Sequence, residues 1–152
     1  MKSSVTVDAV ADYILWVFHE QGKPIDHLKL QKLVYYVQAW HLALYDEPLF
    51  PEHLEAWVNG PVQPGLYRRF KKWYWEPIEE KPECPDLPES VKDHINEVLN
   101  VYGDYPAERL EYNVHREMPW VKARNGVPPL EPCTAVISNQ DMMDFFERMG
   151  RQ

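Results

Sequence analysis

The sequence predicts a mainly α-helical fold with one minor β element near residues 54–58. Apolar residues recur at helical spacing over at least five segments, whereas residues 54–58 alternate between apolar and polar positions. The length of 152 residues suits one domain, and neither a repeat nor a linker divides the chain. We therefore expect residues 1–152 to form a single domain.

The first two helices are predicted from their caps and apolar stripes. Thr6 is the expected N-cap of a helix that ends before Gly22, with Val10, Ile14, Val17 and Phe18 on its inner face. Asp26 is the expected N-cap of a second helix that runs to Tyr45. Its inner stripe is Leu30, Leu33, Val34, Val37, His41 and Leu44. We expect His41 to be a hydrogen-bonded core residue rather than a metal ligand.

In the middle of the chain the spacing of apolar residues changes from the helical period to alternation. Leu54, Ala56 and Val58 alternate with other residues, which predicts a short strand. The turn signal Asn59–Pro61 follows, and Gly60 is expected to adopt a backbone conformation that other residues resist. Pro64 suits the first turn of a third helix, with Leu66, Phe70 and Trp73 inward. The proline-rich segment from Trp75 to Pro88 is predicted to be an exposed loop.

The second half of the chain returns to helical spacing. One predicted helix ends before Gly103 and buries Val91, Ile95, Val98, Leu99 and Tyr102. A shorter helix follows Pro106, with Ala107, Leu110 and Val114 inward. Pro119 and Trp120 are expected to open a turn toward Arg124. The last helix begins with a capping box from Ser138 to Asp141 and buries Met142, Phe145, Phe146 and Met149.

Charge, cysteine usage and motif content argue against several functions. Sixteen Lys and Arg against 24 Asp and Glu give a net charge of −8, which disfavours nucleic acid as a partner. Cys84 and Cys133 cannot form a disulfide framework or a four-thiolate zinc site, and the histidines lack ligand spacing, so we expect no cofactor and no metal. Neither a signal peptide nor a membrane-length apolar run is visible, which predicts a cytoplasmic protein without membrane contact.

The sequence contains no nucleophile motif and no phosphate-binding loop that would indicate catalysis, so we expect no enzyme and no catalytic residues. A small hydrolase that uses the scattered acids and histidines stays a rival hypothesis.

Aromatic residues and a cationic segment indicate a protein-binding surface. Trp57 is expected on the face opposite Leu54, Ala56 and Val58, where it forms a binding hot spot. The cations near residue 68 would dock an acidic protein surface. The candidate partner-binding residues are Trp57, Gly60, Pro61, Tyr67, Arg68 and Arg69.

Three alternatives to this surface stay open. Trp57 could pack under the proline-rich loop, and Tyr67 could belong to the core. The mixture of cations and aromatic residues could instead bind nucleic acid.

Several motifs extend over nearly the whole chain: residues 28–36, 38–45, 48–50, 55–57, 60–67, 102–104 and 115–120. Together they resemble the Panacea antitoxin domain family, which includes SocA-like antitoxins and phage-associated GepA-like proteins. The resemblance implies a mainly helical domain that neutralises a cognate toxin by direct contact, the toxin being encoded by the adjacent gene. It also implies that a protease can be a further partner, because SocA-like proteins act as protease adaptors. The alternative is a phage or mobile-element accessory protein that binds a host factor.

Overall fold

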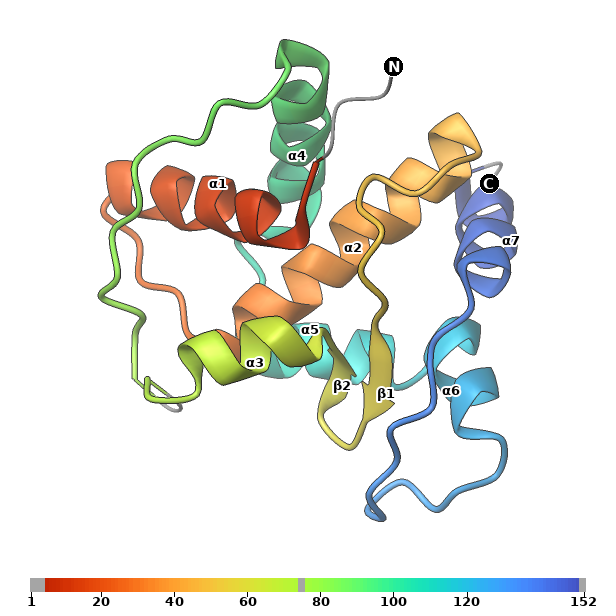
Figure 1. Cartoon of the computed structure of the whole chain (residues 1–152). Helices are drawn as coiled ribbons and strands as arrows, with labels where there is room; N and C mark the ends of the chain where they lie inside the picture. The colour runs from red at the N-terminus through yellow and green to blue at the C-terminus, as the bar shows by residue number, and fades with distance from the viewer. Residues whose placement is uncertain (1–4, 74–75, 151–152) are drawn as a thin grey trace.

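The computed structural model describes residues 5–73 and 76–150. These residues form seven helices and one two-stranded sheet, so the predicted mainly α fold is confirmed. The long helix α2 (His27–Tyr45) crosses the middle of the molecule (Figure 1). Packed against it are α1 (Val7–Glu20), α3 (Pro64–Phe70), α4 (Glu89–Tyr102), α5 (Ala107–Val114), α7 (Asn139–Gly150) and strand β2 (Gly60–Val62). The other elements are β1 (Glu55–Trp57) and α6 (Met118–Arg124).

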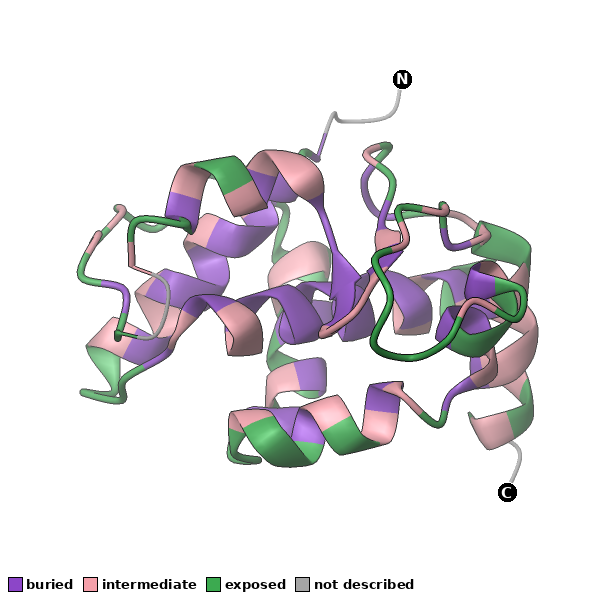
Figure 2. Cartoon of the chain, turned by 90° about the horizontal axis from the view of Figure 1, so that it is seen from below, coloured by how far each residue is buried: buried purple, intermediate pink, exposed green. Residues whose placement is uncertain are grey.

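The core surrounds α2 instead of lining one stripe of it (Figure 2). Every residue from 30 to 39 is buried, including the polar side chains of Gln31, Lys32 and Gln38. The predicted inner stripe therefore contains too few of the buried residues of this segment, because neighbouring elements cover the helix on all sides. The stripe is also too long, because Leu44 is 60% exposed where the last turn of α2 reaches solvent.

Three predicted helix starts are confirmed by their caps. The Thr6 hydroxyl accepts a hydrogen bond from the Ala9 amide at 3.1 Å, and the Asp26 carboxylate accepts one from the Lys29 amide at 2.8 Å. Ser138 caps α7 in the same way, by accepting from the Asp141 amide at 3.1 Å. Side-chain caps satisfy amides that the first helical turn leaves unpaired, which explains why these residues begin helices.

The β element is a hairpin rather than a single strand. Glu55 pairs with Val62 and Trp57 with Gly60, so the connecting loop is Val58–Asn59. The observed strand β1 therefore ends one residue before the predicted end, and Val58 is half-buried in the turn instead of facing the core. The segment that leads to α7 runs beside β1, where the Ala56 amide donates to the Ala135 carbonyl at 2.8 Å.

Two further expectations need correction. Pro119 and Trp120 do not open a turn but belong to α6, because proline is tolerated in the first turn of a helix. The proline-rich loop is not wholly exposed, since Ile78 and Leu87 are buried along it; Trp75 lies outside the described residues. Within residues 5–73 and 76–150, no helix is both long and apolar enough to cross a membrane.

Candidate functional site

A pocket of about 360 Å³ lies beside the hairpin. We name it the hairpin pocket. It is lined by the start of α2 (His27, Leu28, Gln31), the hairpin (residues 57–59 and 62), Tyr67 of α3 and residues 132–134. Its volume is within the range of small-molecule and side-chain pockets. The Trp57 and Tyr67 rings meet here with their centroids 5.0 Å apart.

The structure places Trp57 on the outer face of β1. Leu54 and Ala56 are buried on the other face, as the alternation predicts. The Trp57 indole N–H donates to a Glu55 carboxylate oxygen at 2.8 Å. Its ring lines the hairpin pocket together with residues 132–134, and residues 76–88 of the proline-rich loop do not line the pocket. An aromatic side chain that is half-buried and already oriented loses little freedom when a partner covers it.

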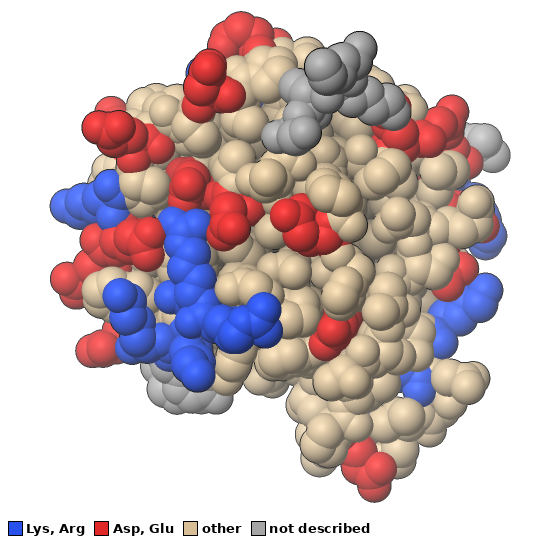
Figure 3. Space-filling model, in the orientation of Figure 1, with Lys and Arg blue, Asp and Glu red and all other residues tan. Residues whose placement is uncertain are grey.

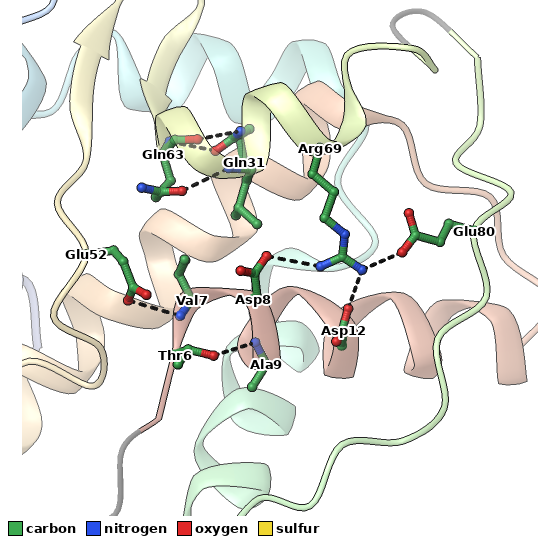
Figure 4. Close-up of polar contacts among 11 residues, drawn as sticks. Thr6, Val7, Asp8, Ala9, Asp12, Gln31, Glu52, Gln63, Arg69 and Glu80 are labelled. Carbon is green, nitrogen blue, oxygen red and sulfur yellow. Dashed lines mark hydrogen bonds and ion pairs between the residues drawn. The ribbon is translucent and has the colours of Figure 1, made fainter.

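The floor of the hairpin pocket is a saturated polar network. The Gln31 amide group donates to His27 Nε2 at 3.0 Å. It also donates to the Gln63 carbonyl at 3.3 Å, and Gln31 accepts from the Gln63 amide at 2.8 Å (Figure 4). Burial lowers the pKa of His27 to about 4, so its ring is neutral at physiological pH. The floor therefore carries no charge, and the pocket suits an apolar or aromatic group.

Arg124 fixes the wall of the pocket. Its buried guanidinium donates to the Ala56 carbonyl at 2.9 Å, to the Pro128 carbonyl at 2.7 Å and to the Glu131 carbonyl. These bonds tie the loop that precedes residues 132–134 to strand β1. Sequence reasoning missed this residue because its carbonyl partners come from segments that are distant in sequence or irregular.

Gly60 and Pro61 lie behind the pocket rather than on its surface. Both are buried, and Gly60 has a φ of +125°, which confirms the predicted need for glycine. A Cβ at Gly60 would lie 3.1 Å from a Val114 methyl group and 3.4 Å from Lys32 Cε. These two residues therefore support the hairpin against α2 and α5.

The cations near α3 divide into two groups. Arg69 pairs with Asp8 at 3.1 Å, Asp12 at 2.6 Å and Glu80 at 2.6 Å (Figure 4). Its charge is thus neutralised within the fold, which differs from the expected free cationic face. Arg68, Lys71 and Lys72 are exposed, and Figure 3 shows Lys and Arg side chains gathered over this region with acidic side chains beside them.

A second buried cluster was not foreseen from the sequence. The Glu117 carboxylate accepts hydrogen bonds from the Tyr35 and Tyr36 hydroxyls, each at 2.9 Å. The Tyr36 ring stacks on the Tyr102 ring, with the ring centroids 3.9 Å apart. We name these four residues the tyrosine–glutamate cluster. Burial raises the pKa of Glu117 to about 7. Glu117 is only 7% exposed, so the cluster is closed to any partner of ordinary size.

A larger groove of about 510 Å³ lies between α1 and α4. Tyr13, Trp16 and Phe18 line it together with Asn96, Asn100 and the Lys23–Asp104 ion pair, and none of the predicted site residues lines it. No group of three His, Cys, Asp or Glu side chains that could hold a metal occurs within the part of the chain that the structure describes. The hairpin pocket is the place where predicted site residues converge.

Comparison with known proteins identifies the family. Residues 30–121 match the model of the antitoxin SocA-like, Panacea domain, which is more than half of the chain. The chain belongs to this family. Over 67 residues it is 40% identical to antitoxin SocA of Caulobacter vibrioides (strain NA1000 / CB15N), a match that covers 44% of this chain and 36% of SocA. The chain thus spans about a third of that relative's length. No solved structure matches it.

The Panacea match contains most of the site. Gln31, Trp57 and Tyr67 of the hairpin pocket fall within residues 30–121, as does Glu117. Residues 132–134, which close the pocket wall, follow the matched region. The matched region therefore provides Gln31 of the polar floor and the aromatic side of the pocket, and the segment before α7 completes the wall.

Proposed function

We propose that this protein is a cytoplasmic antitoxin that neutralises a cognate toxin by direct contact, the toxin being the product of the adjacent gene. The observation that carries the proposal is the convergence of Trp57 and Tyr67 in the hairpin pocket, within the family-matched part of the chain. Tryptophan and tyrosine next to a pocket are typical of binding hot spots. An apolar or aromatic side chain of the toxin would fill the pocket.

Binding explains the chemistry of the site better than catalysis does. The titratable group on the pocket floor, His27, is neutral and engaged with Gln31. A hydrolase needs a base and an activated nucleophile or water within hydrogen-bond reach of the substrate. Cys133 lies on the pocket wall, but it stands alone and carries no paired base in the contacts of the described residues.

Exposed cations extend the proposed surface. Arg68 directly follows Tyr67, and Lys71 and Lys72 are exposed just beyond the end of α3. They would steer an acidic surface of the toxin toward the pocket, while Gly60, Pro61 and Arg69 hold the scaffold in place. We propose that the whole chain acts as one domain in this role.

Co-expression with the adjacent gene tests the proposal. The adjacent gene should arrest growth when expressed alone, and the wild-type protein should restore growth. Trp57→Ala should weaken binding of the purified toxin by about 2 kcal/mol while it barely changes the melting temperature. The matched control is Tyr45→Ala, an exposed tyrosine at the C-terminal end of α2, about 27 Å along the helix from His27 of the pocket.

The outcomes separate the hypotheses. A harmless adjacent product, or one that stays toxic beside the wild-type protein, would refute the antitoxin role and favour an accessory protein that binds a host factor. If Trp57→Ala neutralises as well as Tyr45→Ala does, the interface lies elsewhere. The half-life of the toxin in cells, measured with and without this protein, shows whether a protease takes part.

A further inference from the structure

Helix α5 and the residues next to it carry an outward stripe of two tyrosines and two arginines. Arg109 and Tyr112 share one face of α5, while Tyr105 precedes the helix and Arg116 follows it. Tyr105 contacts Arg109 and Arg116 contacts Tyr112, so the four side chains form one continuous stripe. Leu110 and Val114, on the opposite side of α5, are both buried. The stripe is therefore the face of α5 turned most fully to solvent.

Each arginine of the stripe is stacked on a tyrosine. The Arg109 guanidinium lies 5.9 Å from the Tyr105 ring centre, and the Arg116 guanidinium lies 5.2 Å from the Tyr112 ring centre. Tyr105 is 39% exposed and Tyr112 is 56% exposed. Stacking restricts the long arginine side chains before any partner arrives, which reduces the entropy lost on binding.

Within the part of the chain that the structure describes, Arg109 and Arg116 have no carboxylate partner, unlike Arg69, and no set of carbonyl acceptors, unlike Arg124. Among residues 5–73 and 76–150, no carboxylate forms an ion pair with Arg109 or Arg116. By contrast, Arg69 is held by three carboxylates and Arg124 by three carbonyls. In a chain of net charge −8, two pre-oriented arginines without a carboxylate partner point to recognition of negative groups.

We propose that the α5 stripe is a second protein-binding surface, which takes an acidic segment of a partner. Arg109 and Arg116 are seven residues apart, about 10 Å along a helix. Carboxylates at that separation occur seven residues apart on one face of a helix. The tyrosines then cover the apolar part of the segment.

A protein partner suits this surface better than nucleic acid does. Glu108 is exposed beside the stripe and would repel a continuous phosphate backbone. An acidic protein segment carries its charges at separate points, so that only two must meet arginines. The stripe ends near the hairpin turn, where His115 Nε2 donates to the Val58 carbonyl at 2.7 Å. Its binding of an acidic segment does not depend on the antitoxin role.

Fluorescence anisotropy with two labelled probes tests the proposal. The probes are a glutamate-rich helical peptide of 16 residues with carboxylates seven positions apart, and a single-stranded DNA of 12 nucleotides. The wild-type protein should bind the peptide more tightly than the DNA. The double variant Arg109→Glu/Arg116→Glu should weaken peptide binding at least about tenfold, since each reversal replaces attraction by repulsion.

The matched control is Lys81→Glu/Arg148→Glu, which changes the net charge equally at exposed positions outside α5 and the hairpin pocket. It should change peptide affinity by less than about threefold. The double variant Arg109→Lys/Arg116→Lys keeps the positive charges but loses the planar guanidinium groups. Its peptide affinity should lie between that of the wild-type protein and that of the double glutamate variant. Equal losses in both double variants, preference for DNA, or failure of the wild-type protein to bind the peptide would overturn the proposal.

Discussion

Two aromatic clusters contact α2, and they differ in their access to solvent. In the tyrosine–glutamate cluster, Tyr35 and Tyr36 are completely buried and their hydroxyls are satisfied by Glu117. In the hairpin pocket, Trp57 and Tyr67 meet on an open surface above a neutral histidine. The comparison teaches that aromatic residues within the family-matched region divide between a closed core and an open pocket according to what covers them. Helix α7 covers the first cluster, where Phe146 meets Tyr35 and Tyr36 edge-on.

The largest effect is expected when the closed cluster is broken. Glu117→Ala leaves two buried hydroxyls without an acceptor and opens a cavity, which should lower the free energy of unfolding by about 4 kcal/mol. Urea unfolding at pH 6 measures this loss. Glu97→Ala, at an exposed position of α4, is the control and should stay within about 0.5 kcal/mol of wild type. A Glu117→Ala protein as stable as wild type would show that the cluster contributes nothing.

The two clusters should also impose opposite dependences of stability on pH. The pKa of Glu117 rises from 4.5 to about 7 on folding, so its stabilisation is complete below pH 4.5 and is lost as pH rises toward 7. The pKa of His27 falls from 6.5 to about 4, so its stabilisation is complete above pH 6.5 and is lost as pH falls toward 4. Each contribution amounts to about 3 kcal/mol.

These opposing contributions largely cancel in the wild-type protein and separate in variants. Relative to wild type, Glu117→Gln should gain stability as pH rises from 4.5 to 6.5, and His27→Gln should lose it. Unfolding free energies at several pH values within that range measure both slopes. His53→Gln, at an exposed histidine, serves as the control. If Glu117→Gln follows the wild-type profile, Glu117 does not titrate in this range.

The smallest effect concerns neighbouring arginines beside the hairpin pocket. Arg69→Glu places a carboxylate among Asp8, Asp12 and Glu80 and should cost about 2 kcal/mol of stability. Arg68→Glu should leave stability within about 0.5 kcal/mol of wild type, because Arg68 is exposed. It should instead slow association with the toxin and reduce the salt dependence of the rate. Stopped-flow binding and thermal unfolding of both variants test the distinction, and equal stability of the two would contradict it.

Local sequence determines much of the helical framework. Thr6, Asp26 and Ser138 cap their helices because each side chain reaches an amide only three residues away. The outward position of Trp57 likewise follows from alternation along a strand. In both cases the interacting groups lie within a few residues, so the pattern alone carries the information. The sequence motifs also indicated the resemblance to the Panacea family, and the family match confirms it.

The sequence by itself determined where α1, α2 and α7 begin, which strand face is buried, and to which family the chain belongs. Only the tertiary structure decided that α2 is buried on all sides, that Glu117 lies between two tyrosines of a helix 81 and 82 positions away, and that Arg69 is neutralised. The physical reason is that burial and electrostatic pairing depend on elements brought together from distant parts of the chain. Spacing along one helix cannot show what will cover it, or which of two adjacent arginines will meet a carboxylate.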